Sequence, residues 1–253
     1  MSRIKKILVS QPVPENNKSP YFDLAEKHNL KVDFRPFIHV EGVSAKEFRQ
    51  EKVDLSSHSA VIFTSKTSID HFFRICEETR VTVPDSMKYF CISEATAFYL
   101  QKYIVYRKRK IFYGCGQMED LIETMMKHKD ENFLLPLSDA HKTEIPALLS
   151  NHSFKFTKTI LYRTECSDLS DLADVNYDVL VFYSPSGIKS LFQNFPDFKQ
   201  NETKIASFGN KTAQAAEEAG LRLDIKAPQP QAPSMTMALE NFIKEFNKTN
   251  GKK

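Results

Sequence analysis

An internal repeat constrains the fold of this chain more than any other feature of its sequence. In two places a short apolar segment runs into a hydroxyl-rich turn and then a helical stretch, and aligning the two copies places Ser65 over Ser184. A second turn follows in each copy, where Thr96 aligns with Thr212. Because two successive matches occur in the same order, the sequence predicts two copies of one domain.

Apolar segments of strand length alternate with helical stretches along the whole chain. The predicted strands are at residues 7–10, 32–40, 61–63, 89–92, 110–113, 133–137, 156–163, 179–183, 204–208 and 222–225. Continuous apolar strands that alternate with helices are typical of parallel sheets covered by helices on both faces. The predicted fold class is therefore α/β, with two doubly wound parallel-sheet lobes.

The two copies differ in the number of predicted strands that precede them. Two strands precede the first copy, whereas only the stretch at 156–163 precedes the second. If both sheets hold similar numbers of strands, the N-terminal segment must complete the C-terminal sheet. We therefore predict a discontinuous lobe of residues 1–36 and 167–253, an inserted lobe of residues 40–160, and a hinge of two extended segments at about 34–41 and 158–166.

Composition excludes several classes of protein. The 253 residues, 41% hydrophobic and 26% charged, are typical of two globular domains of moderate size. The net charge of +3 is too small to indicate nucleic-acid binding, and the four cysteines form no C-x-x-C pair. No apolar run approaches the ~20 residues that a membrane span needs. We expect a cytoplasmic protein that binds neither nucleic acid nor membrane, and nothing requires more than a monomer.

Familiar catalytic motifs are missing from the sequence. It contains no G-x-G-x-x-G or Walker loop, no G-x-S-x-G elbow and no spacing typical of metal ligands. The seven histidines are scattered, and His71, on the helix of the first repeat, is predicted to be a surface or packing residue. A catalyst without a cofactor, a metal or an activated nucleophile would act by holding its substrate in one conformation and by placing hydrogen bonds on developing charge.

The turns of the repeat have the chemistry of anion sites. In parallel sheets, ligands bind beyond the carboxyl ends of the strands, where helix N-termini present free N–H groups. Hydroxyl and small residues gather at these ends: Thr64, Ser65, Ser68, Ser93, Thr96, Ser184, Ser186, Gly209 and Thr212. Serine and threonine are also the preferred helix caps, so each residue alone has that alternative role. Four such turns in two matching pairs predict a cleft for an anion with several carboxylates or phosphates.

Short motifs along the chain resemble those of one family. They lie at residues 61–65, 160–164, 182–187, 208–213, 219–221 and 232–236. Their order and separation, over nearly the whole chain, resemble the uroporphyrinogen-III synthases. The chain departs from that family at Gln11, where many members have arginine, and at Ser93, where glycine is common.

The resemblance implies a fold and a reaction. The fold would be two flavodoxin-like lobes joined by a two-stranded hinge. The reaction would convert linear hydroxymethylbilane, which carries eight carboxylates, into a macrocycle in haem biosynthesis. The terminal hydroxyl leaves as water, ring D is inverted through a spirocyclic intermediate, and no metal or organic cofactor is expected.

The resemblance also implies roles for particular residues. Tyr162, in the Tyr-Arg-Thr motif, would assist departure of the hydroxyl as a general acid or hydrogen-bond donor, the alternative being a hinge tyrosine bonded locally. The residues expected to bind the substrate are Thr64, Ser65, Thr96, Lys142, Ser184, Ser186, Gly209, Lys211 and Thr212.

Two other functions remain open at the level of sequence. The first is a non-catalytic two-lobe protein that binds an anionic metabolite. The second is a flavin-binding lobe, which would need a phosphate-binding loop after the first strand. Residues 11–15, with two prolines, form a poor loop of that kind.

Overall fold

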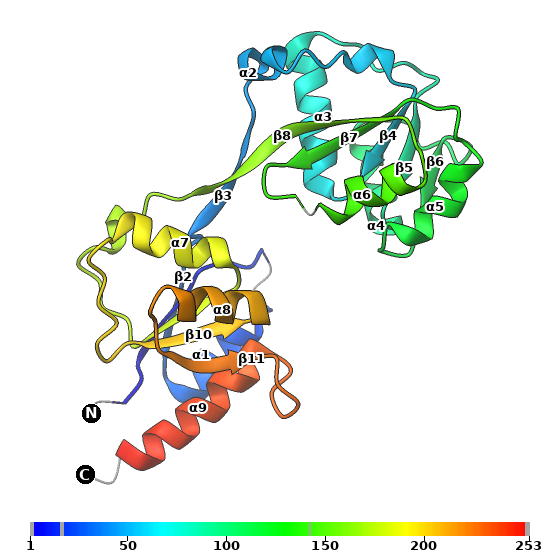
Figure 1. Ribbon diagram of the computed structural model, residues 1–253. Coiled ribbons are helices and arrows are strands. Elements are labelled where there is room, and N and C mark those ends of the chain that lie inside the picture. The colour runs from blue at the N-terminus through cyan, green and yellow to red at the C-terminus, as the bar shows by residue number, and fades with distance from the viewer. Residues whose placement is uncertain (1–2, 16–17, 142, 251–253) are drawn as a thin grey trace. The chain divides into compact units, whose positions relative to one another are not determined.

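The computed structural model describes residues 3–15, 18–141 and 143–250, and it divides the chain into two compact units (Figure 1). Unit 1 is Met1–His39 with Glu165–Lys253, and unit 2 is Val40–Thr164. The predicted substrate residue Lys142 lies outside the described residues. Each unit has its own buried hydrophobic core, so each can be described by itself.

Unit 1 contains a five-stranded sheet in the order β11-β10-β9-β1-β2, and all its strand pairs are parallel. Its elements are β1 (Lys6–Val9), α1 (Pro20–His28), β2 (Lys31–Phe34), a short 3-10 helix η3 (Ser170–Leu172), β9 (Val179–Phe182), α7 (Pro185–Asn194), β10 (Lys204–Phe208), α8 (Asn210–Glu218), β11 (Leu223–Ala227) and α9 (Met235–Asn250).

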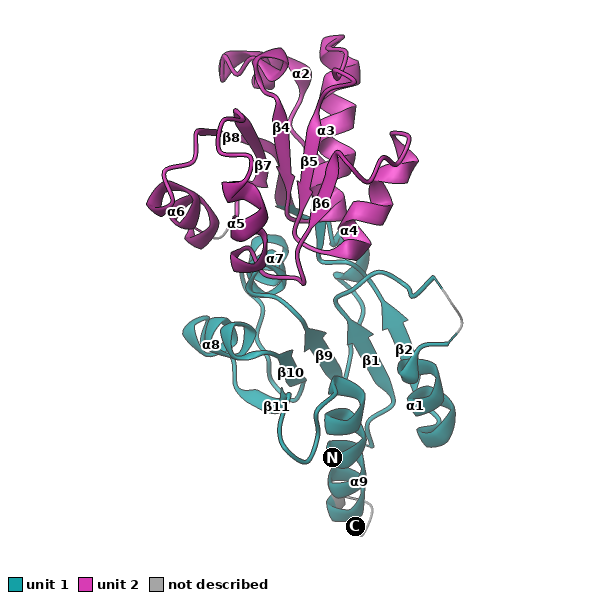
Figure 2. Cartoon of the chain, turned by 90° about the vertical axis from the view of Figure 1, so that its right-hand side faces the viewer, with its two compact units in different colours: residues 1–39, 165–253 teal, residues 40–164 magenta. Residues whose placement is uncertain are grey.

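Helices cover both faces of the unit 1 sheet (Figure 2). Alternate side chains of β9 point to opposite faces, as the pleat requires. Val181 packs with residues of α1 and α9, such as Leu24, while Leu180 packs with residues of α7 and α8, such as Ile188. Burial on both faces explains why every residue of β9 is apolar.

Unit 2 contains most of a six-stranded sheet in the order β3-β8-β7-β4-β5-β6. Its elements are β3 (Ile38–Gly42), α2 (Ala45–Gln50), η1 (Leu55–Ser57), β4 (Ala60–Phe63), α3 (Lys66–Thr79), β5 (Lys88–Cys91), α4 (Glu94–Tyr99), η2 (Leu100–Lys102), β6 (Ile111–Tyr113), α5 (Glu119–Met126), β7 (Phe133–Ser138), α6 (Glu144–Asn151) and β8 (Phe156–Cys166). The pairs β4–β5, β4–β7, β5–β6 and β7–β8 are parallel.

The unit 2 sheet is covered in the same way. Phe63 of β4 packs with Phe72 of α3, whereas Ile62, the residue before it, packs with Leu121 of α5. The prediction of an α/β fold with two mostly parallel sheets is confirmed. Within the described residues, no helix combines the length and apolar character needed to cross a membrane.

The chain passes between the units twice, once within β3 and once within β8. The Val43 N–H donates to the Leu161 carbonyl at 3.0 Å, and the Ser167 N–H donates to the Phe37 carbonyl at 2.9 Å. Because residue numbers rise along one segment and fall along the other, the two segments run antiparallel. The hinge role of these segments and the exact lobe boundaries stay predictions.

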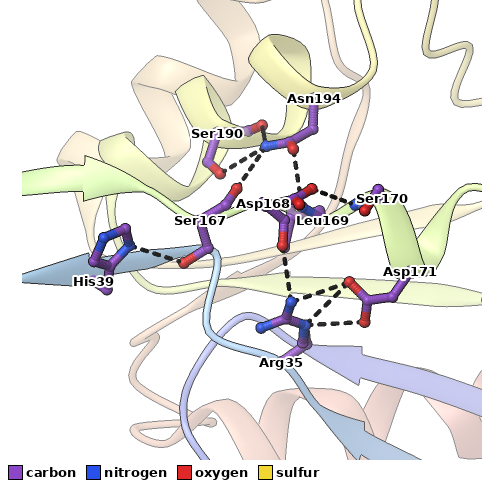
Figure 3. A network of polar contacts seen from close by, with 9 residues as sticks. All are labelled: Arg35, His39, Ser167, Asp168, Leu169, Ser170, Asp171, Ser190 and Asn194. Atoms are coloured by element: carbon purple, nitrogen blue, oxygen red, sulfur yellow. Dashed lines mark hydrogen bonds and ion pairs between the residues drawn. The ribbon is translucent and has the colours of Figure 1, made fainter.

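A polar network attaches the segment after β8 to unit 1 (Figure 3). Arg35 donates through Nε and Nη2 to the Asp171 carboxylate at 3.0 Å, and through Nη2 to the Asp168 carbonyl at 2.8 Å. The Asn194 side chain donates to the Ser167 carbonyl and accepts from the Leu169 N–H, both at 2.9 Å. These hydrogen bonds hold the backbone of residues 167–169, where the chain enters unit 1.

Strand order identifies where each sheet changes its direction of winding. In unit 1 the change falls between β1 and β9, and in unit 2 between β4 and β7. Such points open a crevice beyond the carboxyl ends of the strands, which is where ligands bind in folds of this class. The turns after β9 and β4 begin with Tyr183 and Thr64, next to the two aligned serines Ser184 and Ser65.

Candidate functional site

In the turn after β4, serine hydroxyls hydrogen-bond to the backbone at the start of helix α3. Ser65 is the N-cap of α3, and its Oγ accepts from the Ser68 N–H at 3.1 Å. Ser68 Oγ accepts from the Ser65 N–H at 3.3 Å and donates to the Ser65 carbonyl at 2.7 Å. This capping box satisfies free donors at the start of the helix. Thr64, the predicted binding residue before it, is half-buried.

Tyr162 lies against this same turn. It occupies β8, is 9% exposed, and has its hydroxyl 3.4 Å from Ser65 Oγ. Its ring stacks on the His71 imidazole, with centroids 5.0 Å apart and planes 17° apart. The structure thus brings together two of the residues expected from the sequence, and it buries the tyrosine more deeply than its place in an extended connection suggested.

His71 is the neighbour that sequence reasoning set aside. Its Nδ1 accepts from Arg74 Nε at 3.1 Å, and a guanidinium can only donate, so Nδ1 carries no proton in this arrangement. Burial lowers the pKa of His71, and the positive charge of Arg74 lowers it further. The ring beside Tyr162 is therefore neutral near pH 7, with its proton on Nε2. The helical register of Ser65, Ser68 and His71 on α3 was the signal that could have placed the imidazole near the turn.

The turn after β5 is also closed by its own hydroxyls. Ser93 is the N-cap of α4, and its Oγ accepts from the Thr96 N–H at 3.3 Å. The Thr96 hydroxyl, on a side chain that is 5% exposed, lies 3.0 Å from Ser93 Oγ. Both groups thus have a partner inside the protein.

In unit 1, the turn after β9 has the same serine cap as the turn after β4, but a glycine stands where Ser68 completes the capping box. Ser184 caps α7 by accepting from the Gly187 N–H at 3.2 Å. Gly187 has no hydroxyl with which to complete a capping box. A Cβ built on it would lie 3.7 Å from the hydroxyl of Ser10, which follows β1, so the turns after the two central strands adjoin. Ser186 is half-buried in the first turn of α7.

The turn after β10 is the most open of the four. Gly209 is the N-cap of α8, with φ 86° and ψ 149°, and no side chain among the described residues caps the first N–H groups of that helix. A Cβ on Gly209 would meet no atom within 4 Å, so its backbone conformation, and not lack of space, requires glycine. Thr212 is 3% exposed, and Lys211 beside it is exposed. Helix donors without a cap are suited to bind an anion.

A pair of tyrosines stands beside the first unit 1 turn. The hydroxyls of Tyr183 and Tyr21 are 2.7 Å apart, and burial raises the pKa of both phenols. Tyr183 follows β9 directly, and Tyr21 is at the start of α1. Sequence reasoning did not single out either phenol, because nothing in the spacing of these residues shows that α1 covers that end of the sheet.

Lysines near the turns are exposed. They are Lys66 at the start of α3, Lys189 on α7 and Lys211 on α8. The Lys66 ammonium lies 5.4 Å from the centroid of the Tyr99 ring, a cation–π contact. Each of these cations can turn toward a bound anion without first being drawn out of the protein interior.

The fold and the turns define a class of protein: a two-unit α/β protein whose helix N-termini, hydroxyls and lysines suit an anion with several negative groups. A model of the family described as uroporphyrinogen-III synthase HemD matches residues 19–237. The chain belongs to the uroporphyrinogen-III synthase family.

Two solved structures share the fold over nearly the whole chain. The uroporphyrinogen-III synthetase of Helicobacter pylori has 18% sequence identity and a TM-score of 0.58, covering 96% of this chain and 100% of that one. A mutant uroporphyrinogen III synthase of Thermus thermophilus has 14% identity and a TM-score of 0.52, covering 95% of this chain and 99% of that one. No curated protein matches the chain.

The predicted family and its activity, cyclisation of the tetrapyrrole hydroxymethylbilane in haem biosynthesis, are confirmed by the family match. The match favours the enzyme over a non-catalytic binding protein or a flavin-binding lobe. The roles of individual residues remain predictions.

Proposed function

We propose that this chain closes hydroxymethylbilane to uroporphyrinogen III with Tyr162 as the hydrogen-bond donor to the departing hydroxyl. The observation that carries the proposal is the position of the Tyr162 phenol, 3.4 Å from Ser65 Oγ at the N-terminus of α3. That position is beyond the carboxyl end of a central strand, where ligands bind in doubly wound sheets.

The first step is loss of the terminal hydroxyl as water: its C–O bond breaks, the adjoining pyrrole releases its N–H proton, and the hydroxyl takes up an equivalent proton. A hydroxyl leaves more readily when a donor stabilises the negative charge that develops on its oxygen. The Tyr162 O–H supplies that donor, and Ser65, bonded to the helix, keeps a second hydroxyl within reach. The carbon left electron-poor is then attacked by ring D through its substituted carbon, which leads by way of the spirocyclic intermediate to the inverted ring.

The second task is to hold a flexible substrate in one conformation. Without an enzyme the bilane can close to the isomer in which ring D is not inverted, so orientation determines the product. We propose that helix N–H groups, neutral hydroxyls and lysines of the turns bind the substrate carboxylates. The proposed binding residues are Thr64, Ser65, Thr96, Lys142, Ser184, Ser186, Gly209, Lys211 and Thr212.

We further propose that the chain acts in the cytoplasm as a monomer, without a cofactor, nucleic acid or membrane. In this proposal the segments at 34–41 and 158–166 act as the hinge of the two lobes. Size-exclusion chromatography with light scattering tests the monomer, and full activity after dialysis against a chelator tests independence from a dissociable metal.

The decisive experiment measures the isomer formed. Purified protein is incubated with freshly made hydroxymethylbilane, the product is oxidised, and isomers I and III are separated by chromatography. We expect a shift from isomer I to isomer III without added cofactor. A folded protein that binds the bilane but leaves isomer I as the product would instead support the non-catalytic binding protein.

The role of Tyr162 is tested by Tyr162→Phe, with Tyr177→Phe as the matched control. The Tyr177 hydroxyl donates to Asp33 in unit 1 and lies in none of the four turns. We expect Tyr162→Phe to lower kcat roughly 10-fold, because at neutral pH a phenol donates a hydrogen bond more readily than a whole proton. Full rate and full isomer selectivity in a stable Tyr162→Phe variant would remove Tyr162 from the mechanism.

A further inference from the structure

Arg74 connects helix α3 to both segments that leave unit 2. Its Nη2 donates to the Val43 carbonyl at 2.8 Å and to the Leu161 carbonyl at 3.2 Å. Its Nη1 donates to Glu78 at 2.8 Å, and its Nε donates to His71 Nδ1 at 3.1 Å. All three guanidinium nitrogens are thus used, and two of the four acceptors are backbone groups whose position is fixed by the strands.

Gly42 makes room for this guanidinium. A Cβ on Gly42 would lie 2.7 Å from Arg74 Cζ and Nη2 and 2.8 Å from Nε, distances that real Cβ atoms do not show. The guanidinium therefore lies directly against the backbone of β3. A side chain at position 42 and the present placement of Arg74 exclude each other.

The contacts of Arg74 reach Tyr162 by two routes. Through the backbone, Arg74 bonds to the carbonyl of Leu161, which belongs to the same peptide group as the Tyr162 N–H. Through the side chain, it orients His71, whose ring stacks on Tyr162 at 5.0 Å. Ser65, which begins the helix carrying both residues, faces the phenol hydroxyl.

We infer that Arg74 and His71 are positioning residues, which hold the Tyr162 phenol at the N-terminus of α3 by fixing its peptide and its ring. The inference rests on the proposed function, because it gives a catalytic purpose to the placement of Tyr162. Neither residue is assigned a contact with substrate. A guanidinium is suited to this task because its donors form a rigid, planar fork, which a lysine cannot reproduce.

The imidazole must be neutral for this arrangement. The charged groups that act on it are Arg74, Asp70 and Glu78, and its other ring contact is Tyr162. A protonated His71 would point an N–H at the Arg74 donor, and the hydrogen bond that orients the ring would be lost. Replacing Arg74 must therefore change the tautomer and titration of His71 as well as the position of Tyr162.

The test uses full-length protein labelled with 13C and 15N in histidine and with 13C in tyrosine. The variants are Arg74→Met, Arg74→Lys, His71→Phe and Gly42→Ala, with Arg49→Met, an exposed arginine on α2, as the control. His71→Phe and Tyr162→Phe assign the two signals. In the parent protein we expect the His71 nitrogen shifts of an Nε2-protonated ring. In Arg74→Met and Gly42→Ala we expect mixed tautomers and a displaced Tyr162 signal.

Kinetics supply a second reading of the same variants. We expect Arg74→Met and Gly42→Ala to lower kcat on the order of tenfold and to change KM less than twofold, because the residues position a catalytic group without binding substrate. Arg74→Lys should restore little of the loss, and Arg49→Met should leave both signals and kcat unchanged.

Two results would overturn the inference. One is a folded Arg74→Met variant whose His71 and Tyr162 signals match those of the parent, and the other is a loss confined to KM. If Arg74→Met does not fold, Arg74→Lys and His71→Phe decide by the same Tyr162 signal. If the parent forms no isomer III while the signals move as expected, the proposed function fails, whereas the positioning of Tyr162 stands.

Discussion

The first turns of the two units share a backbone design but differ in their hydrogen bonding. Ser65 and Ser184 each cap a helix at the carboxyl end of a buried central strand. At the third helical position, unit 2 has Ser68, which completes a capping box, whereas unit 1 has Gly187, which cannot. Both copies of the repeat therefore have the serine cap, but they differ in the residue three positions after it.

The second turns differ in the same sense. Ser93 holds the Thr96 hydroxyl in unit 2, while Gly209 stands at the aligned position in unit 1, and within the described part of the chain no side chain caps the helix that it begins. An anion that binds in unit 2 must therefore compete with internal hydrogen bonds, whereas in unit 1 it meets free donors. Under the proposed function, we therefore expect the open turn after β10 to bind a carboxylate more readily than the closed turn after β5.

The connecting segments are held by unlike groups on the equivalent helices. On α7 the neutral amide of Asn194 donates to the Ser167 carbonyl, and on α3 the cation of Arg74 donates to the Val43 and Leu161 carbonyls. The guanidinium spans two segments where the amide reaches one. Duplicated helices thus perform the same anchoring with different chemistry.

The largest effect is expected when the open turn of unit 1 is changed. Gly209→Ala should lower the free energy of unfolding by about 1–3 kcal/mol, because φ 86° with ψ 149° is strained for any residue with a Cβ. The same change should raise KM for the bilane, since the helix N–H groups can no longer be presented in the same way. Denaturant unfolding and steady-state kinetics measure the two effects.

Gly187→Ala is the matched control for that change. Its Cβ would make ordinary contacts, the nearest at 3.4 Å from Phe182, and its backbone is helical. We expect stability to stay within about 1 kcal/mol of the parent protein, because alanine is favoured over glycine in a helix by about that amount. Equal loss in both variants would show that the backbone conformation of Gly209 is no more demanding of glycine than the helical position of Gly187.

Replacing each of the two aligned threonines with valine should distinguish a role in stability from a role in substrate binding. Thr96→Val removes the hydroxyl that bonds to Ser93 Oγ, leaves the backbone N–H that also donates to it, and should lower the free energy of unfolding by about 1 kcal/mol. Thr212→Val breaks no side-chain hydrogen bond among the described residues, so it should cost less stability and mainly raise KM. Thermal melts and kinetics on both variants check this. The reverse pattern would place the binding turn in unit 2.

The alternation of apolar strands and helices was enough to predict the α/β class, because it is a local property, and the repeat predicted that there would be two such sheets. The start of the first helix also follows from local residue types: Ser19 caps α1 and Pro20 occupies its first turn. Helix α2 carries little such signal, because its six residues include only one buried side chain, Phe48.

The environment of Tyr162 could not be read in the same way. A strand residue shows its face but not which helix covers that face, and the neighbour His71 is distant from it in the chain. The internal bonds of Ser93 with Thr96 were likewise hidden, because serine favours both a cap and a ligand contact. The sequence does not show which side chains contact each other in the folded protein.

The smallest expected effect is a difference in how the two units respond to acid. His58 in unit 2 is 5% exposed, its Nδ1 lies 2.9 Å from the Asp54 carbonyl, and its Nε2 has no hydrogen-bond partner among the described residues. Burial lowers the pKa of His58, and it also lowers those of His71 and His128 in the same unit.

The pKa values of all three histidines are shifted downward. With a folded-state pKa below the ordinary value of about 6.5, each histidine binds a proton more readily in the unfolded chain, so stability is lost as the pH falls below that value. We expect hydrogen exchange in β4 to accelerate more than in β9 between about pH 7.5 and 5.5, after correction for intrinsic rates. His58→Phe, which keeps a buried ring that cannot titrate, should reduce that difference. Equal acceleration in β4 and β9 would show that acid acts on both units alike, and the contrast between them would then be limited to their turns.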